Sequence, residues 1–380
     1  MTQPDNFGFG EEAALLKESA RKFFADNFTT EQLHSLVGAD PTPDRMTDCL
    51  WREDLWQQMV DLGWTALAVP ESAGGLAMPL VAVAGLVEEV GRAAFPCPLL
   101  GTLNATYVLA ACGASAEGAL EEIAAGRAAT LAHTNAEGSW DLDHCGVSLE
   151  DGKLSGTAAY VQDARKVDRA LVAASHAGGI GLYWVDLAAA GVRLEANAIV
   201  DLTRDQASLV FDGVEVDGQA VVELSRDGAD ALATAMPAIW TLLAADMVGA
   251  GEWQLQTTVE YANARQQFDK SLGFFQAIKH PLVNVMVEVD KSKSLVYSAA
   301  CAFDTEPERA ARLAHMAKSA ASDMADFASS RSVQFHGGIG FTWECFVHLY
   351  FKRQKHSQQL LGDGPWHRAR LAELLIDKAA

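Results

Sequence analysis

The first third of the chain carries hydrophobic residues at the spacing of amphipathic helices. Over residues 9–36 the apolar positions follow one helical period, so we expect one helix there. A polar, proline-bearing loop follows at Gly38–Asp48, and shorter helical patterns resume after it. Two of these patterns stop at Gly63 and Gly126, as expected of glycine at helix C-termini. We therefore predict an all-helical domain over residues 1–127.

The hydrophobic pattern then changes to short segments with strand character. Turns such as Asp151-Gly152 and Asp212-Gly213 separate them. Strands at such regular spacing are typical of a barrel or a sandwich, so we expect a β-barrel domain over residues 128–224. The expected strands are Ala128–Ala132, Gly146–Leu149, Lys153–Ala159, Ala170–Ala174, Gly181–Val185, Val192–Leu194 and Ala207–Val216.

Long helical patterns return after residue 225. The three longest cover Ala229–Ala264, Phe275–Phe303 and Pro307–Gln334. We expect Pro281 in the first turn of the second helix, where proline is tolerated. Long helices packed together are typical of a four-helix bundle, which we predict over residues 225–380. The expected fold class is therefore mainly α, with a β-barrel between two helical domains.

Composition narrows the class of protein. The chain has 380 residues, and its net charge of −21 argues against nucleic acid and anionic membrane surfaces as partners. The N-terminus is acidic, and we find no apolar run of membrane-spanning length, so we expect a cytoplasmic protein. The six cysteines form no CxxC pair and no metal-like spacing, so we expect reduced cysteines and no metal site.

Two glycine-marked segments near the end of the chain suit an anionic ligand. One reads Q-F-H-G-G-I-G-F at Gln334–Phe341, and the other reads L-L-G-D-G-P-W-H at Leu360–His367. Glycine lets a ligand approach the backbone closely, and helix ends favour anions. Neither segment matches the dinucleotide fingerprint G-x-G-x-x-G. Taken singly, His336 and His367 are more often structural than catalytic.

Three further short patterns have a functional and an ordinary interpretation. Arg265, after a long helix, suits a pyrophosphate, although a helix-terminal arginine is as simple an explanation. Tyr160 and Gln162 would place an aromatic face and an amide against a flat ligand, or would simply end a strand. Ser139, after a glycine, would hold a phosphate oxygen or be a solvated loop residue.

Together, these patterns resemble the acyl-CoA dehydrogenase family over essentially the whole chain. The matching motifs are R-x-x-F at Arg265–Phe268 with Gln276 eight residues later, Q-x-x-G-G-x-G-F at Gln334–Phe341, and S-G-T-A-A-Y-V-Q at Ser155–Gln162. The order of helical domain, β-barrel and helical bundle is also that of the family. The resemblance implies α,β-dehydrogenation of an acyl-CoA substrate, with FAD bound between two subunits and an electron-transfer flavoprotein as electron acceptor.

The resemblance also assigns residues to FAD. In the bundle, Arg265 would lie near the pyrophosphate, and the other FAD contacts would be Gln266, Phe268 and Gln276. Across the subunit contact, the adenine-side half would meet Gln334, Gly337 and Gly338. In the β-domain, Tyr160 would flank the isoalloxazine, Gln162 would face the reactive flavin nitrogen, and Ser139 would line the entrance for cofactor and CoA.

The catalytic base is where the sequence departs from the family. Counting from Gln334, the family's glutamate falls on Leu361, whereas a shift of two residues would place Asp363 there. The alternative base position in the long helix is Ile239, and the next residue, an arginine in straight-chain members, is Trp240. The glycine that usually follows Phe268 is Asp269. A leucine or an isoleucine cannot take a proton, so Asp363 is the candidate base.

Two interpretations remain open. The chain is either an active dehydrogenase that uses Asp363, or a non-catalytic subunit that supports FAD in a heterotetramer. Such heterotetramers act on bulky, steroid-type substrates, and a small subunit is also named for dicarboxyl-CoA dehydrogenases. A homotetramer is the expectation under the first interpretation. A helical scaffold without flavin is a third, remote interpretation.

Overall fold

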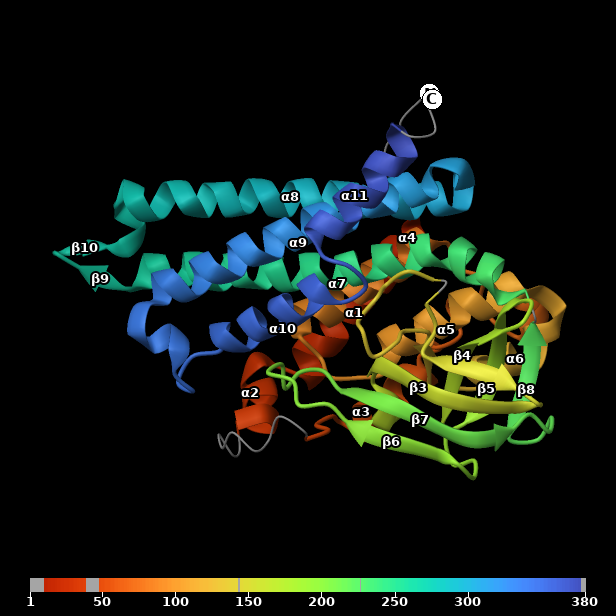
Figure 1. Cartoon of the computed structure of the whole chain (residues 1–380). Coiled ribbons are helices and arrows are strands. Elements are labelled where there is room, and N and C mark those ends of the chain that lie inside the picture. The colour runs from red at the N-terminus through yellow and green to blue at the C-terminus, as the bar shows by residue number, and fades with distance from the viewer. Residues whose placement is uncertain (1–9, 39–47, 143, 226, 377–380) are drawn as a thin grey trace. The chain divides into compact units, whose positions relative to one another are not determined.

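A computed structural model describes residues 10–38, 48–142, 144–225 and 227–376 (Figure 1). The chain packs as two compact units, which we describe separately. Unit 1 consists of residues 1–42, 79–95 and 240–380, and unit 2 consists of residues 43–78 and 96–239. This division differs from the three sequence-predicted domains, whose boundaries stay a prediction.

Unit 1 is helical. The long helices expected in the last third of the chain are confirmed, and α8 and α9 pack side by side (Figure 1). Pro281 is an exception to the prediction, because α8 begins five residues earlier and the proline lies inside it. The helices of the unit are α1 (Glu11–Asn27), α2 (Thr30–Gly38), α4 (Leu80–Ala93), α8 (Gln276–Thr305), α9 (Pro307–His336), α10 (Val347–Gln359), α11 (Gly364–Leu375) and the later part of α7 (Gly228–Ala264).

The helix expected over residues 9–36 is two helices. Helix α1 ends at Asn27 and α2 begins at Thr30. Between them, the Thr29 amide donates to Gln32 Oε1 at 2.7 Å, and the Gln32 amide donates to Thr29 Oγ1 at 3.4 Å. This reciprocal pair is a capping box, which starts a new helix and interrupts the old one. The prediction of a single helix was therefore wrong at a place where the T-x-x-Q spacing signals a break.

Helices α4 and α7 approach each other closely within unit 1. A Cβ atom on Gly91 would lie 2.0 Å from the Asp246 carbonyl oxygen, and one on Gly249 would lie 1.8 Å from the Glu88 carbonyl oxygen. Real Cβ atoms cannot approach a backbone oxygen so closely. Glycine on each helix is therefore what permits this backbone contact.

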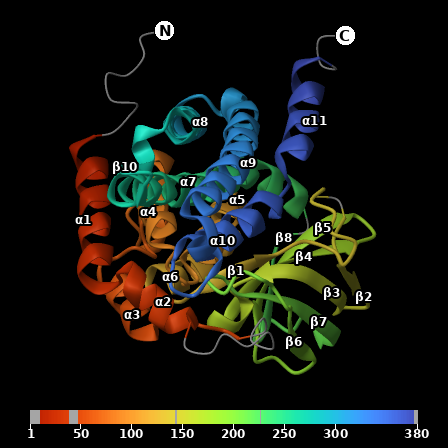
Figure 2. The ribbon, with the colours of Figure 1, turned by 90° about the vertical axis from the view of Figure 1, so that its left-hand side faces the viewer.

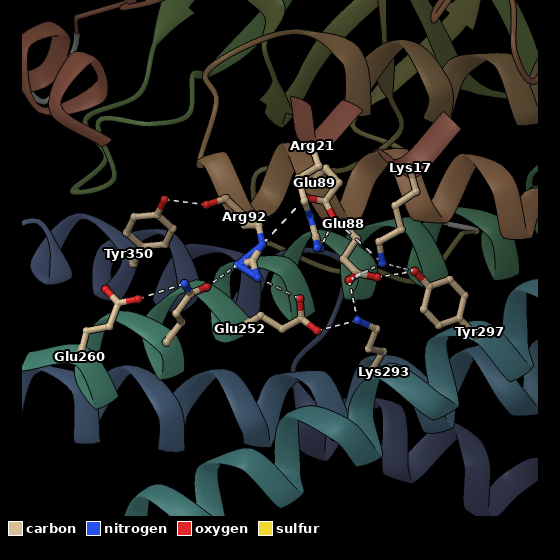
Figure 3. A network of polar contacts seen from close by, with 11 residues as sticks. Lys17, Arg21, Glu88, Glu89, Arg92, Glu252, Glu260, Lys293, Tyr297 and Tyr350 are labelled. Carbon is tan, nitrogen blue, oxygen red and sulfur yellow. Dashed lines mark hydrogen bonds and ion pairs between the residues drawn. The ribbon is translucent and has the colours of Figure 1, made fainter. Parts of the chain in front are cut away.

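A buried ionic network, drawn in Figure 3, links the helices of unit 1. Glu88 of α4 is 1% exposed and lies 2.6 Å from Lys17 Nζ of α1 and 2.9 Å from Lys293 Nζ of α8. The Tyr297 hydroxyl also donates to this carboxylate. Next to it, Glu89 accepts from Arg21 at 2.7 Å. A buried carboxylate needs such partners, so the network fixes α1, α4 and α8 together.

Unit 2 contains a sheet of eight strands, with α3 (Glu53–Asp61), α5 (Leu99–Cys112) and α6 (Glu117–Ala124). The sheet order is β6-β7-β3-β2-β4-β5-β8, and β1 pairs in parallel with β4; Figure 2 shows it from a second side. All the predicted strands are present, and the sequence missed β8. The strands are β1 (Ala129–Ala132), β2 (Val147–Glu150), β3 (Lys153–Gln162), β4 (Arg169–His176), β5 (Gly179–Asp186), β6 (Val192–Ala196), β7 (Gln206–Glu215) and β8 (Val221–Ser225).

Two helical stretches, Leu99–Ala124 and Gly228–Ala264, are long and apolar enough to cross a membrane by length and composition. The expectation that no stretch reaches this length was therefore wrong. In Gly228–Ala264, 89% of the apolar window is buried, against 61% in Leu99–Ala124. A helix that is apolar on all sides and buried in protein is a core helix, which accounts for α7.

Candidate functional site

A hairpin at one end of unit 1 carries the first group of predicted FAD residues. Two-residue strands, β9 (Gln266–Gln267) and β10 (Lys270–Ser271), flank Phe268 and Asp269, whose φ angles are +54° and +60°. Two consecutive positive φ angles define the tight turn that matches strand twist. Asp269 therefore stands at a left-handed position, which glycine favours and which aspartate tolerates better than most residues.

The predicted FAD-binding side chains at this end of unit 1 are exposed on the surface of the unit. Phe268 is 88% exposed, and Arg265, Gln266 and Gln276 are also exposed. Helix α9 ends at the same end of the unit (Figure 1), with Gln334 exposed in its last turn. A Cβ added to Gly337 or Gly338 would meet nothing within 4 Å. An exposed cation, amides, an aromatic ring and open glycine backbone fit a cofactor that has a pyrophosphate and flat rings.

The second group of predicted FAD residues lies in unit 2, where β3 is irregular. Tyr160 has a φ angle of +57° and lies in the register shift between Ala158 and Val161. Its hydroxyl donates to the Ala136 carbonyl at 3.3 Å. A left-handed backbone at a bulky residue is strained, and such strain concentrates at ligand sites.

The Gln162 side chain has a free acceptor. Its Nε2 donates to the Tyr160 carbonyl at 3.1 Å, whereas its Oε1 is buried and has no hydrogen-bond partner in the described parts of the chain. A buried, unbonded amide oxygen is costly and therefore fits a donor supplied by a ligand. This observation supports a flavin at the C-terminal end of β3.

Ser139 lies in a polar loop next to residues that the sequence did not identify. Its Oγ accepts from the Asp141 amide at 3.2 Å and lies 3.1 Å from His144 Nδ1. The Trp140 ring lies 6.4 Å from the Tyr160 ring. The structure thus brings Ser139 and Tyr160 into one neighbourhood through Trp140, a residue that no motif marked.

The turn at which the sequence count from Gln334 predicts the family's base is Leu361–Asp363. Leu361 has a φ angle of +58°, and Asp363 is the N-cap residue of α11. The Asp363 Oδ1 atom accepts from the Trp366 amide at 2.8 Å. Aspartate at the N-cap position of a helix commonly accepts this hydrogen bond. The candidate base is therefore bonded to the backbone of its own helix.

A buried lysine donates hydrogen bonds to the backbone of this turn. Lys318 of α9 is 0% exposed, and its Nζ donates to the carbonyls of Gly362 at 2.8 Å and Gln358 at 3.2 Å, and to Ser322 Oγ at 3.2 Å. Burial lowers the pKa of the Lys318 ammonium to about 7, although the Asp363 carboxylate opposes the shift. The three partners match the three donors of an ammonium group.

Four rings pack together beside the turn, and we call them the four-ring cluster: Trp240, His315, Trp366 and His367. Trp240 of α7 lies 4.4 Å from the His315 ring of α9 and 5.4 Å from the His367 ring of α11. Trp366 lies 4.9 Å from His367. Trp240, His315 and His367 are all buried. These separations are those of rings in direct contact.

Hydrogen bonds fix the tautomers of the two histidines. His367 Nε2 lies 3.2 Å from the Leu361 carbonyl, which can only accept, so this nitrogen carries the proton. The Nδ1 of a neutral His367 is then an acceptor. Because His315 Nδ1 lies 2.8 Å from it, His315 must be the donor. Protonating His367 would turn its Nδ1 into a donor, and the bond would then require His315 to carry its own proton on Nε2.

We expect acid to destabilise the protein through this pair. Burial lowers the pKa of His315 to about 4 and, together with the Lys318 charge, that of His367 to about 2. Between the ordinary pKa of about 6.5 and these values, the unfolded state binds more protons than the folded state. The contribution of the pair is therefore complete above pH ~6.5 and is lost as the pH falls below it. Urea unfolding from pH 7.5 to 4.5 measures the slope.

Other buried histidines add to that slope, so a variant must isolate the pair. Burial also lowers the pKa values of His133 and His348 to about 4. The slope of the free energy of unfolding against pH reports how many protons are taken up on unfolding. In His315→Leu, this number should fall by up to one between pH 6.5 and 4.5. An unchanged slope in His315→Leu would contradict the assignment.

Comparison with known proteins identifies the family. Residues 10–127 match the family model "Acyl-CoA dehydrogenase, N-terminal domain", and residues 227–376 match "Acyl-CoA dehydrogenase, C-terminal domain". The chain is 33% identical over 352 residues to acyl-CoA dehydrogenase IpdE2 of Mycobacterium tuberculosis, which covers 92% of this chain and 93% of the relative. This chain belongs to the acyl-CoA dehydrogenase family. The resemblance found in the sequence is therefore confirmed.

Solved structures of acyl-CoA dehydrogenases agree with the fold. A Tcur3481–Tcur3483 steroid ACAD variant matches with a TM-score of 0.85 and 29% identity, over 97% of this chain and 99% of that one. The ChsE4–ChsE5 complex from Mycobacterium tuberculosis matches with a TM-score of 0.83 and 25% identity, over 97% and 99%. The predicted fold class, the FAD cofactor and participation in acyl-CoA α,β-dehydrogenation are confirmed at the level of the family. The individual FAD contacts stay predictions.

Proposed function

We propose that this chain is the base-lacking subunit of a heteromeric acyl-CoA dehydrogenase that acts on a bulky, steroid-type acyl-CoA. One observation carries the proposal, namely the absence of a usable carboxylate at the turn. Leu361 occupies the position of the family's glutamate, and its side chain cannot take a proton. Ile239 occupies the alternative position in α7. General-base catalysis needs an ionisable group within ~3 Å of the proton that it removes.

The second candidate is an active dehydrogenase that uses Asp363. Its carboxylate belongs to the turn, but Oδ1 already accepts from the Trp366 amide. While Oδ1 caps the helix, only Oδ2 is left to take a proton, and freeing the whole side chain would cost about 1 kcal/mol. It is also one methylene shorter than glutamate, and a misplacement of about 1 Å can cost ~100-fold in rate. Both considerations favour the base-lacking subunit.

The assignment of a bulky substrate and a second subunit draws on the relatives. Two of the solved structures are a steroid ACAD from a Tcur3481–Tcur3483 pair and a ChsE4–ChsE5 complex, so both pair two different chains. We propose a partner of the same family for this chain, which would supply the base. An electron-transfer flavoprotein as acceptor and a cytoplasmic location remain part of the proposal.

The residues of this chain would bind and orient FAD. When bound, FAD supplies the ring that accepts a hydride from the substrate. Arg265 would bind the pyrophosphate, and the open backbone at Gly337 and Gly338 would admit the adenine side. At the other unit, the free Oε1 of Gln162 would accept a hydrogen bond from the ring system, and the Tyr160 ring would lie against it.

Flavin reduction in the presence and absence of a partner tests the proposal. The chain purified alone with excess FAD should not bleach flavin when octanoyl-CoA or a steroid-side-chain CoA thioester is added. A complex with a co-purifying second family member should bleach it with the steroid-type substrate. Bleaching by the chain alone would overturn the proposal.

The variant Asp363→Asn separates the two candidates. Asparagine is as good an N-cap as aspartate but cannot act as a base. We therefore expect the bleaching rate of the complex and the melting temperature to stay within experimental error of the wild type. Asp363→Ala is the control, because it should lower stability by about 1 kcal/mol through loss of the cap. A fall in rate of 100-fold or more in Asp363→Asn, with stability unchanged, would establish Asp363 as the base.

A further inference from the structure

We infer that an exposed apolar stripe on α8, made of Val283, Met286 and Val287, is the surface on which the base-supplying partner subunit docks. The inference rests on the proposed function, because it gives a place on this chain to the partner that this function requires. The stripe contains none of the predicted FAD residues. It is therefore a surface that no motif in the sequence marked.

Helical spacing places the stripe opposite the buried face of α8, which lies along the edge of unit 1 (Figure 1). The buried residues in the first half of this helix are Leu282, Val285 and Val289. Val283 and Val287 each precede a buried valine by two residues, a rotation of about 200° around the helix axis. Their side chains therefore point away from the core of the unit, and they are 47% and 51% exposed. Met286, three residues after Val283, is 44% exposed.

Valine is an unusual residue for the solvated face of a helix. It is a poorer helix former than lysine, glutamate or glutamine, because its branched side chain loses rotamer freedom in a helix. At an exposed position, no packing in the free chain offsets this cost. A helix with apolar residues on two opposite faces is expected to be covered on both, and neighbouring exposed apolar side chains mark protein–protein contacts. The stripe therefore fits a contact with another protein.

The surroundings of the stripe have the composition of an interface. Beyond Val287 the exposed positions of α8 are polar, namely Asp290, Lys291 and Ser294. Directly before the helix, Phe274 is 59% exposed, at the end of the unit where FAD is predicted to bind. An apolar centre with a polar rim is the usual arrangement of a protein–protein interface. The stripe and the predicted FAD contacts thus lie on one helix and the hairpin before it.

Net charge and the proposed function favour a different chain over a second copy as the occupant. This chain has a net charge of −21, so two copies repel each other, and a less acidic partner avoids that repulsion. The proposed function already requires a second family member to supply the base. A second copy would lack the base as well, because it would carry the same leucine at position 361. We therefore assign the stripe to the second family member.

A charge placed in the stripe tests the inference on the complex of the full chain with the co-purifying second family member. In Val287→Glu, a carboxylate would be buried in the contact, so the Kd of the complex in sedimentation velocity should rise about 100-fold or more. Leu15→Glu is the matched control, because Leu15 is an apolar residue on α1 that is 63% exposed. It should leave the Kd unchanged, and both variants should keep the melting temperature of the chain alone. Hydrogen exchange over residues 276–290 should be slower in the wild-type complex than in the chain alone.

Four outcomes overturn the inference. An unchanged Kd in Val287→Glu does so alone, and flavin bleaching by that complex would show that the proposed function survives. Self-association of the chain that Val287→Glu abolishes would assign the stripe to a second copy. Equal protection of residues 276–290 in the chain alone would show that this chain covers the stripe itself. Absence of any co-purifying family member overturns the inference and the proposed function together. If Val287→Glu does not fold, Val283→Gln takes its place, with the same expectations.

Discussion

Replacing Glu88 with leucine is expected to lower the free energy of unfolding by about 3–5 kcal/mol, the cost of removing one partner from a buried ionic pair. Glu88 is the carboxylate that Lys17 and Lys293 share in Figure 3. Leucine would leave two ammonium groups facing each other, with Lys17 only 16% and Lys293 30% exposed at the side chain. The Tyr297 hydroxyl would lose its acceptor as well.

The expected pH dependence follows from the same contacts. Burial by itself would raise the pKa of Glu88, but the charges of Lys17 and Lys293 hold it below the ordinary value. A carboxyl group whose pKa is lowered by folding stabilises the protein above its unfolded pKa of about 4.3 and loses that contribution as the pH falls further. The free energy of unfolding lost in Glu88→Leu relative to the wild type should therefore be largest at pH 7 and become smaller below pH ~4.

Glu288→Ala is the matched control for this prediction. Glu288 lies on α8, the helix that also carries Lys293, and pairs with Lys291 at 3.0 Å on the surface. Surface pairs contribute at most about 1 kcal/mol. Urea unfolding at pH 7 measures both variants. A loss in Glu88→Leu no larger than that in Glu288→Ala would show that the network of Figure 3 does not hold α1, α4 and α8 together.

Replacing Gly249 with alanine is the second large effect that we expect, with a loss of about 3 kcal/mol, at the upper end of the range for overpacking. The new methyl group would lie 1.8 Å from the Glu88 carbonyl oxygen and 2.8 Å from the Arg92 amide nitrogen. Backbone atoms cannot move aside as a flexible side chain can. Helices α4 and α7 would have to separate, which also strains the network around Glu88.

Gly118→Ala tests whether the loss comes from the close approach or from glycine chemistry in general. Gly118 lies inside α6, and a Cβ there would meet nothing within 4 Å. Alanine in such a position should stabilise the protein by about 0.5–1 kcal/mol, because glycine loses more conformational entropy on folding. The two variants should therefore shift the urea midpoint in opposite directions. Stabilisation by Gly249→Ala would exclude a backbone contact between α4 and α7.

The local elements were largely predictable because their signals are local. The strands from β1 to β7 and the long helices α7, α8 and α9 each follow a hydrophobic period of their own. The missed elements lack such a signal. The buried residues of β8, Val221 and Leu224, are three residues apart rather than two, and the β9–β10 hairpin turns on Phe268-Asp269 rather than on a glycine pair. In contrast, the T-x-x-Q spacing at Thr29–Gln32 does signal a helix start. We did not predict the break there because the apolar residues keep the same helical period across it.

The residues of the candidate site also divide into those that a local sequence motif marks and those that it does not. Arg265, Gln334 and Tyr160 could be proposed from the sequence, and stay predictions, because each belongs to a short motif in which neighbours in the sequence mark the position. His315 and Lys318 were not found, because no motif surrounds them. They lie on the middle of α9 and meet their partners on α10, α11 and the turn only after folding. Asp363 was found, but its partner, the Trp366 amide, becomes visible only when α11 forms.

The sequence by itself determined that this protein is an acyl-CoA dehydrogenase relative without a glutamate at the usual position, since residue identity needs no structure. It also determined the order of helical and β regions, because the spacing of apolar residues is a local property. Only the tertiary structure decided that Asp363 caps a helix and that Trp240, His315, Trp366 and His367 form one cluster. Contacts between residues far apart in sequence depend on how the helices pack, and hydrophobic periodicity alone does not specify that packing.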